Sequence, residues 1–440
     1  MKSIVSALIH TTLALILAGS TLTGAAQEVS GSISGTITDV SGAAVKGATV
    51  TLTNTDRNQD VRVLSTNSAG FYTASSLPLG TYTVKVVDGG FKTDLVTAIV
   101  LHVDDSLTIN RQLQVGSTDQ SVTVQADALA INLENSSVSG LVNGTQVREL
   151  VLSTRNYEQL LSLQPGVAFT GATDQIYLGP TNPLGGANTV AFSVGGQRTS
   201  ANNWTIDGAD NVDRGSNLTL LAFPSVDAIA EFRTLRGTYS AEFGRSAAGQ
   251  VNVVTRSGTN DLHGSAYEFF RNDILQANNY FSNLSRLARP PLRYNDFGYT
   301  VGGPVYVSKI YNGRDKTFFF LSQEFRRVIT YSPVVLYVPT AAERQGVFPV
   351  AVCANVTSAG VCGTPAGTTQ ITNVSPTAQA YLKDIYRNLP LPNPATGQDI
   401  HALTYNGRNV FNDTQEFVRI DQAFGQRWNV FYRYLHDSIN

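Results

Sequence analysis

Residues 316–326 read KTFFFLSQEFR, a run that mixes aromatic and polar residues over the length of a membrane-crossing β-strand. Such strands need about ten residues that alternate between apolar and polar character. Four further runs have the same character, at residues 262–271, 296–305, 416–421 and 428–435. Each contains aromatic residues, which suit the two membrane interfaces. The sequence therefore predicts a mainly β fold, in which residues 259–440 form the first strands of an incomplete outer-membrane β-barrel.

The connections between these runs alternate in length. Residues 272–295 and 328–412 are long, whereas residues 306–315 and 422–427 are short. Barrels of this kind have long extracellular loops and short periplasmic turns, so we expect the long connections outside the cell.

The two cysteines, Cys353 and Cys362, lie in the second long connection, within a Gly-, Thr- and Ala-rich stretch. In an oxidising compartment we expect a local disulfide between them. A metal site is the alternative, but none of the five histidines has ligand spacing to either cysteine. We therefore expect no metal and no cofactor.

Composition excludes several classes of function. The chain has 31 Lys and Arg against 33 Asp and Glu, and a formal net charge of -2, so it lacks the basic surface on which nucleic-acid binding depends. It contains no His-x-x-Glu pair, no Gly-x-Ser-x-Gly motif and no phosphate-binding loop, so we do not expect an enzyme. The 38 Gly, 18 Tyr and 20 Phe fit a β-rich protein with many turns.

The N-terminus has the pattern of a signal peptide, which we assign to residues 1–26. Lys2 precedes an apolar stretch from Ile4 to Gly19, and small residues up to Ala26 suit cleavage by a signal peptidase. A membrane anchor is the alternative, but polar residues interrupt the stretch before it reaches the roughly 18 residues that an anchor needs.

Residues 29–115 alternate in seven short runs separated by Gly, Asn, Asp and Pro, which predicts a small antiparallel β-sandwich. Four segments carry a family resemblance: 35–39, 44–50, 66–72 and 77–82. They resemble the carboxypeptidase-regulatory-like domain, which groups with carbohydrate-binding-like sandwiches. The resemblance implies a non-catalytic domain and does not by itself imply sugar binding.

Residues 147–258 change to a mixed α/β pattern. Short helical turns end at Pro165-Gly166, and residues 204–211 read as a strand that enters an Asp-Gly turn. Several ordered motifs in this region resemble the plug of TonB-dependent receptors, and their amino-acid sequences are similar to those of the Oar-like branch. The motifs are residues 155–167, 194–198, 202–208, 224–233, 239–245 and 249–255.

The resemblance implies a plug at 147–258 whose charged residues include Arg198, Asp207, Arg233 and Arg236. These side chains are candidates for gating charges between the plug and the barrel wall. Ordinary salt bridges and turn hydrogen bonds within the plug are the alternative.

The segment before the plug, residues 119–146, is predicted as a linker. Its first part resembles a TonB box, an extended peptide that an energy-transducing partner captures by strand addition. The residues of this partner-binding segment are Ser121, Val122, Thr123, Val124, Gln125 and Ala126. A last strand of the sandwich is the alternative.

The resemblance as a whole implies TonB-dependent uptake of an unknown substrate through the outer membrane, with the N-terminal domains in the periplasm. The implied partners are a TonB-like energy-transducing protein, outer-membrane lipid and the substrate. A surface protein that binds a partner or carbohydrate without transport is the alternative. Barrels of this family have many more strands than the five readable here, so the sequence predicts a fragment.

Overall fold

The computed structural model describes residues 30–125, 137–152, 154–170, 191–215, 217–240, 243–278, 280, 283, 288–353, 368–372, 374–394, 397–426 and 428–439. The predicted signal peptide lies outside these residues. The chain divides into two compact units. Unit 1 comprises residues 1–268, 296–326 and 412–440, and unit 2 comprises residues 269–295 and 327–411.

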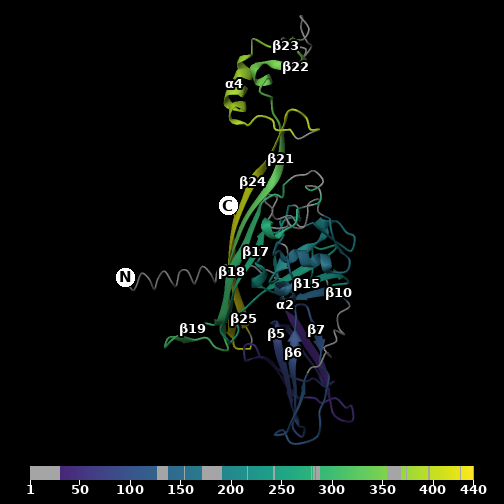
Figure 1. Ribbon diagram of the computed structural model, residues 1–440. Coiled ribbons are helices and arrows are strands. Elements are labelled where there is room, and N and C mark those ends of the chain that lie inside the picture. Colours follow the sequence, from purple (N-terminus) through teal and green to yellow (C-terminus); the bar gives the residue numbers. More distant parts are fainter. Residues whose placement is uncertain are drawn as a thin grey trace, which may run out of the picture. The chain divides into compact units, whose positions relative to one another are not determined.

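Unit 1 begins with a β-sandwich of two sheets (Figure 1). One sheet has the order β4-β1-β7, with β8 also paired to β1, and the other has the order β3-β2-β5-β6-β9. The strands are β1 Gly31–Thr38, β2 Thr49–Asn54, β3 Gln59–Ser65, β4 Phe71–Leu77, β5 Gly80–Val87, β6 Thr93–Leu101, β7 Ser106–Thr108, β8 Arg111–Gln112 and β9 Ser121–Gln125.

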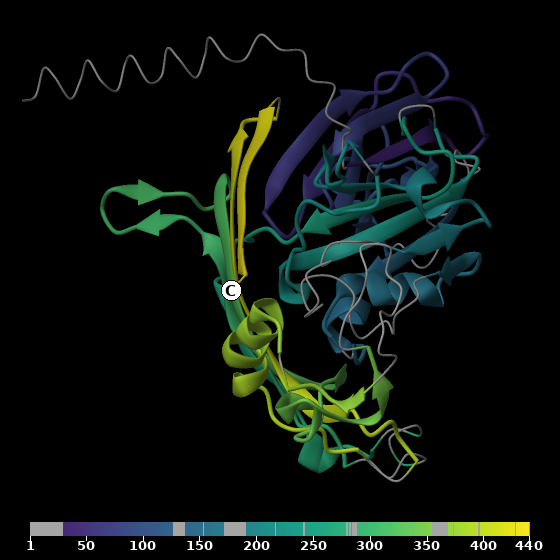
Figure 2. The ribbon, with the colours of Figure 1, turned by 90° about the horizontal axis from the view of Figure 1, so that it is seen from above.

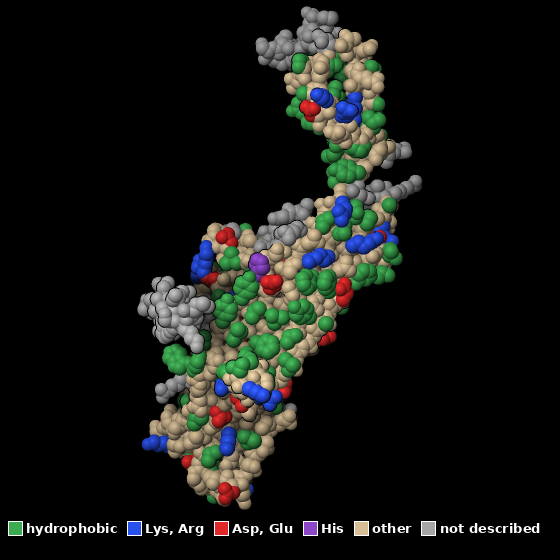
Figure 3. Space-filling view, turned by 90° about the vertical axis from the view of Figure 1, so that its left-hand side faces the viewer, with side chains coloured by type: hydrophobic (Ala, Val, Ile, Leu, Met, Phe, Trp, Pro, Cys, Tyr) green, Lys and Arg blue, Asp and Glu red, His purple; other side chains and the backbone are tan. Residues whose placement is uncertain are grey.

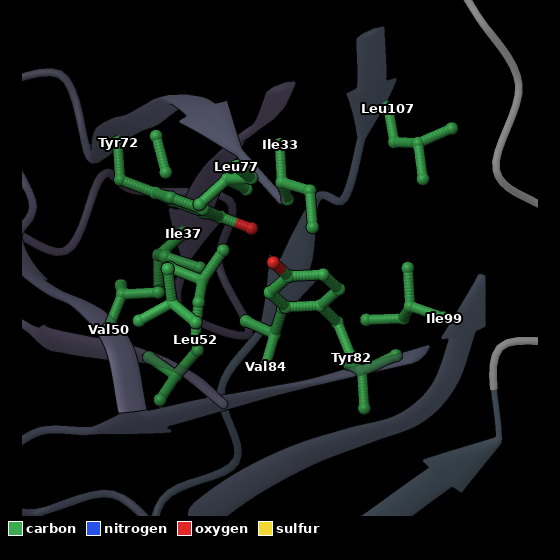
Figure 4. Close-up of a cluster of buried hydrophobic side chains, with 14 of the residues drawn as sticks. Ile33, Ile37, Val50, Leu52, Tyr72, Leu77, Tyr82, Val84, Ile99 and Leu107 are labelled. Carbon is green, nitrogen blue, oxygen red and sulfur yellow. The ribbon is translucent and has the colours of Figure 1, made fainter. Parts of the chain in front are cut away.

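Alternation along these strands places apolar side chains between the two sheets, as the sequence predicts. Figure 4 shows Ile33 and Tyr72 from one sheet and Leu52 and Tyr82 from the other in this core. Both buried tyrosines have a partner for the hydroxyl, because Tyr72 donates to the Ile109 carbonyl (3.0 Å) and Tyr82 to the Pro78 carbonyl (2.7 Å). Burial raises the pKa of Tyr82 to about 12.

The sandwich differs from the prediction at its margins. Most strand pairs are antiparallel, but β7 and β8 run parallel to β1, and β9 runs parallel to β6. The sheet extends to Gln125, beyond the predicted boundary at 115, because Val122 and Val124 give β9 an alternating, half-buried face. Residues 126–136 lie outside the described part of the chain.

The second part of unit 1 is a five-stranded sheet in the order β10-β15-β16-β13-β14, here called the central sheet. Its strands are β10 Val138–Asn143, β15 Ile229–Gly237, β16 Gln250–Thr255, β13 Asn203–Ile206 and β14 Ala209–Asp210. β13 is parallel to β16, and the other pairs are antiparallel. β10 falls in the predicted linker, so part of that segment is a strand instead.

Short helices flank the central sheet: α2 Gly144–Glu149, η2 Tyr157–Leu163, η5 Thr199–Ala201 and η6 Val226–Ala228. A capping box starts α2, in which Asn143 and Gln146 each bond the other's backbone N–H. β11 Val167–Phe169 and β12 Phe192–Val194 form a separate pair. No helix in the described residues is long and apolar enough to cross a membrane.

The third sheet has the order β17-β18-β21-β24-β25 and is here called the strand sheet (Figure 2). Its strands are β17 His263–Asn272, β18 Leu292–Pro304, β21 Thr317–Tyr337, β24 Ala402–Phe424 and β25 Trp428–Ile439. All five predicted runs lie in these strands, and β21 and β24 are far longer than the runs. β19 Tyr306–Val307 and β20 Tyr311–Asn312 form a hairpin that projects from the sheet between β18 and β21.

One face of the strand sheet is buried within unit 1 and the other is exposed. On β21, Phe318 and Phe320 are buried, whereas Phe319 between them is only partly covered. The same two-residue period holds on β18, where Asp296 and Thr300 are buried and Phe297 and Tyr299 are exposed. We call the two faces inner and outer. Figure 3 shows hydrophobic side chains gathered over the outer face.

Unit 2 contains one end of each of four strands and the elements between them. The strand residues are 269–272 of β17, 292–295 of β18, 327–337 of β21 and 402–411 of β24. The elements between the strands are η7 Asp273–Leu275, η8 Glu343–Gln345, β22 Val347–Val352, β23 Thr368–Gln370, α4 Pro376–Asp384 and η9 Tyr386–Asn388. Arg344 holds the segment after η9, donating to the carbonyls of Tyr386 (2.6 Å) and Leu389 (3.1 Å).

Candidate functional site

Five charged side chains meet where the central sheet contacts the inner face of the strand sheet, and we call them the buried ion cluster. They are Arg155 before η2, Asp227 on η6, Asp296 on β18, and Glu324 and Arg326 on β21. Arg155 pairs with Asp227 through Nη2. Arg326 bonds both strand carboxylates at 2.9 Å, Asp296 through Nε and Glu324 through Nη2.

Arg155 joins the two halves of the cluster. Its Nε lies 3.8 Å from Asp296 Oδ2, and its Nη2 lies 3.9 Å from Glu324 Oε2. Its guanidinium also sits 4.9 Å from the ring centroid of Tyr267, whose hydroxyl donates to Glu324 Oε2 (2.9 Å). Arg155 has a φ of 52°, an unfavourable backbone conformation that persists only where the surroundings hold the residue.

Burial makes the cluster energetically important. At most 5% of the side chain of Arg155, Asp296, Glu324 or Arg326 is accessible to solvent. Charges removed from water cost several kcal/mol each unless they are paired, so loss of one member leaves the others uncompensated.

Glu158 on η2 is also buried, and neither carboxylate oxygen has a hydrogen-bond partner among the described residues. Burial raises its pKa to about 8. At neutral pH Glu158 therefore retains its proton and adds no negative charge to the interior.

A second group of charges surrounds Asp207, in the turn between β13 and β14. Asp207 (φ 46°) and Gly208 (φ 78°) both have positive φ, as a two-residue hairpin turn requires. The Asp207 carboxylate accepts from Arg433 Nη1 (2.8 Å) and Arg419 Nη1 (3.2 Å) on the inner face of the strand sheet. It also accepts from the backbone N–H (2.8 Å) and hydroxyl (2.6 Å) of Thr255.

The sandwich reaches the same region through the turn after β2. Arg57 donates to Ser257 Oγ (2.7 Å) and lies 3.4 Å from Asp421, which pairs in turn with Arg419. The turn after β24 is held as well, because Arg62 donates to the Gln426 carbonyl (2.8 Å).

A loop of the sandwich, residues 102–105 directly after β6, binds the central sheet, and we call it the latch loop. Glu231 on β15 accepts from the Val103 N–H (2.6 Å) and contacts His102 Nδ1 (2.6 Å). Two further bonds join Arg233 to Asp105 and Asn252 to Asp104 (2.7 Å). The sandwich is thus attached to the central sheet by charged hydrogen bonds.

The latch loop makes the stability of unit 1 depend on pH. The hydrogen bond to Glu231 raises the pKa of His102 above its usual value of 6.5. The interaction stabilises the folded state fully below pH 6.5 and is lost as the pH rises through the higher folded-state pKa. We expect His102→Gln to lower the free energy of unfolding by about 1 kcal/mol at pH 5.5 and by much less at pH 9. Denaturant titrations at both pH values test this, and an equal loss at both would contradict it.

The structure separates the four predicted plug charges. Asp207 contacts Arg419 and Arg433 on the strand sheet. Arg233 contacts the sandwich instead, and Arg236 bonds the carbonyls of Pro165 and Ser139 (3.1 Å) within the central part. Arg198 is exposed and forms no ion pair in the described residues.

The other predicted sites are also placed. Residues 121–125 form β9, while Ala126 lies outside the described residues. Cys353 is disulfide-bonded, and Cys362 lies outside the described residues. In the described part of the chain, no cluster of His, Cys, Asp or Glu has the arrangement of a metal site.

Reasoning from sequence did not find the buried ion cluster. Alternation was the available signal, because Asp296, Glu324 and Arg326 occupy inner positions of predicted strands. Arg155 and Asp227 gave no such signal, since Arg155 precedes one short 3-10 turn, Asp227 lies within another, and the two are 72 positions apart.

Unit 2 contains a cavity of about 740 Å³. Its lining is mainly aromatic and aliphatic, with Tyr337, Phe348, Tyr381 and Tyr386 as the largest side chains. Glu343 and His401 lie at its wall and bond each other (2.8 Å). The volume is that of a small-molecule site.

Two known families match parts of the chain. Residues 32–114 match the carboxypeptidase regulatory-like domain, and residues 254–440 match the outer membrane beta barrel domain. The TonB-dependent transporter Oar of Myxococcus xanthus is 26% identical over 316 residues, which are 68% of this chain and 27% of that protein. The resemblance to Oar-like TonB-dependent receptors is confirmed. The chain thus spans about a quarter of the length of this relative.

Solved structures of outer-membrane proteins are also similar to the chain. The transporter YddB of Escherichia coli has a TM-score of 0.37 and 11% identity, over 68% of this chain and 33% of that one. The ferric enterobactin receptor PfeA of Pseudomonas aeruginosa has a TM-score of 0.36 and 11% identity, over 69% of this chain and 33% of that one.

Proposed function

We propose that the chain is the N-terminal part of an outer-membrane transporter that a TonB-like protein of the inner membrane energises. The central sheet serves as the plug, the strand sheet is the first part of the barrel wall, and the sandwich lies in the periplasm. The buried ion cluster is the observation that carries this proposal. Its charges come from both the central sheet and the inner face of the strands.

Ion pairs suit a plug that must be held firmly and yet move. Burial makes the pairs of Arg155 with the strand carboxylates costly to break singly. Displacement of the plug admits water, which solvates the same charges and lowers the free energy of the separated state. The contacts of Asp207 with Arg419 and Arg433 act in the same way at the second position.

The partner captures the segment from Ser121 to Ala126 by strand addition. β9 is the last strand in its sheet order, so one of its edges is unpaired in the described part of the sandwich. An unpaired edge is a template for a strand of another chain. A pull on β9 acts on β6, which continues directly into the latch loop on the central sheet.

Cysteine cross-linking tests this capture without knowledge of the substrate. Thr123→Cys places an exposed thiol on β9, and Val63→Cys places one on β3, the edge strand at the other side of the same sheet. Each variant of the full chain is mixed with the periplasmic domain of a TonB-like protein that carries single cysteines. We expect disulfide-linked product from Thr123→Cys at least tenfold above that from Val63→Cys.

Equal yields from the two variants would refute capture at β9. Deletion of residues 121–126 then separates the two functions in cells. Transport requires that uptake is lost, whereas a surface protein that only binds a partner or sugar would keep its activity.

A further inference from the structure

A groove lies where the β19–β20 hairpin meets the strand sheet. It has a volume of about 660 Å³. Leu262, Pro304, Tyr306 and Phe319 give it an apolar half, and Asn312 and Arg314 give it a polar half. The groove is therefore amphipathic along its length.

The apolar half belongs to the outer face of the strand sheet. Phe319 alternates with the inner residues Phe318 and Phe320, and Leu262 is 75% exposed at the start of β17. Tyr299 and Val301 on β18 are also exposed. Hydrophobic side chains gather over this outer face (Figure 3). In a protein that crosses a membrane by strands, such a face contacts lipid.

The polar half lies at the end of the strand sheet that contacts the sandwich. Asn260 donates to the Arg57 carbonyl (2.7 Å) in the sandwich and to Asp315 (2.7 Å) beside the hairpin. The groove thus joins residues of the apolar outer face to Asn260, which contacts the sandwich. In the outer-membrane placement proposed above, this level is the boundary between acyl chains and water on the periplasmic side.

The charge of the hairpin is positive. Residues 305–316 contain Lys309, Arg314 and Lys316 against the single carboxylate of Asp315. Lys316 lies over the Tyr311 ring (5.4 Å), and Asp315 is engaged by Asn260. Arg314 is exposed at the groove and forms no ion pair within the described residues, so its five donors are open to an anion.

We propose that this groove binds one anionic glycerophospholipid of the periplasmic leaflet. Arg314 and the Asn312 amide hold the phosphate, and the apolar half holds the first part of the acyl chains. A guanidinium matches phosphate geometry through paired hydrogen bonds, and Tyr306 sits at the level of the headgroups where aromatic residues are favoured. The proposal rests on the outer-membrane location proposed above.

Native mass spectrometry of the detergent-solubilised chain with added phosphatidylglycerol tests the groove. We expect the wild-type chain to retain one lipid. The bound fraction in Arg314→Gln and in Leu262→Asn should correspond to an affinity at least fivefold weaker than that of wild type. Lys309→Gln removes a charge from the hairpin tip outside the groove and should change affinity less than twofold. Phosphatidylethanolamine should bind at least threefold more weakly than phosphatidylglycerol.

Three outcomes would overturn the proposal. They are equal binding by wild type and Arg314→Gln, a loss in Lys309→Gln as large as that in Arg314→Gln, and displacement of the lipid by millimolar inorganic phosphate. The last result would mean a site for free phosphate. The measurement needs no transport or cellular location, so its failure is distinct from failure of the cysteine capture at Thr123.

Discussion

Replacement of Arg155 by Met should lower the free energy of unfolding of the central sheet by about 3–5 kcal/mol, the loss typical of a broken buried ion pair. Methionine fills most of the volume but carries no charge. Asp227 loses its ion-pair partner among the described residues, and Asp296 and Glu324 keep Arg326. The cluster then contains three buried carboxyl groups and one guanidinium.

A single tryptophan can report this loss. The chain has two, of which Trp204 is buried in β13 and Trp428 is exposed on β25. In a Trp428→Phe background, urea titration in detergent micelles follows the central sheet through Trp204 fluorescence. The midpoint and slope give the free energy of unfolding for each variant.

Two further variants distinguish charge from packing. Arg155→Met combined with Asp227→Asn removes one carboxylate along with the guanidinium. The free energy of unfolding of this double variant should therefore be at least about 1 kcal/mol higher than that of Arg155→Met alone. Arg198→Met removes an exposed arginine that forms no ion pair with the described residues, and it should lower the free energy of unfolding by no more than about 0.5 kcal/mol. A loss of under 1 kcal/mol in Arg155→Met would show that the cluster does not hold the central sheet.

Local patterns explain why much of the fold could be predicted from the sequence. Strand alternation and turn residues act over a few positions, so the sandwich strands and the Asp207-Gly208 turn were visible directly. The runs of the strand sheet were visible for the same reason. The lengths of β21 and β24 were not, because Pro333 in β21 and the Asn- and Gly-containing residues 405–409 in β24 resemble loop signals.

Long-range pairing explains what the sequence did not show. β9 and β10 are short strands whose partners, β6 and β15, are distant in the chain. The local pattern therefore left β9 open as a last strand or a linker and predicted a linker at β10. Arg233 illustrates the same limit among the charges. The sequence left open whether Arg233 contacts the barrel wall or pairs within the plug, and in the structure it pairs with Asp105 in the sandwich loop.

Replacement of Asp207 by Asn should lower the free energy of unfolding by about 2–3 kcal/mol, which is the second large effect. Asparagine tolerates the positive φ of this turn, so the backbone is unaffected and the loss reports on the carboxylate, which binds Arg419, Arg433 and Thr255. Arg433 would lose its ion-pair partner among the described residues, whereas Arg419 would keep Asp421.

A double-mutant cycle isolates that contact in the same fluorescence titration. Asp207→Asn, Arg433→Gln and the double variant should give a coupling energy of about 1–3 kcal/mol, because both groups are largely removed from water. A coupling energy below about 0.5 kcal/mol would mean that Arg433 does not hold the turn. Coupling of the expected size would show that the ion pair of Asp207 with Arg433 links the central sheet to β25, separately from the buried ion cluster. In the transporter proposed above, displacement of the plug would break both contacts, so it would require an external source of energy.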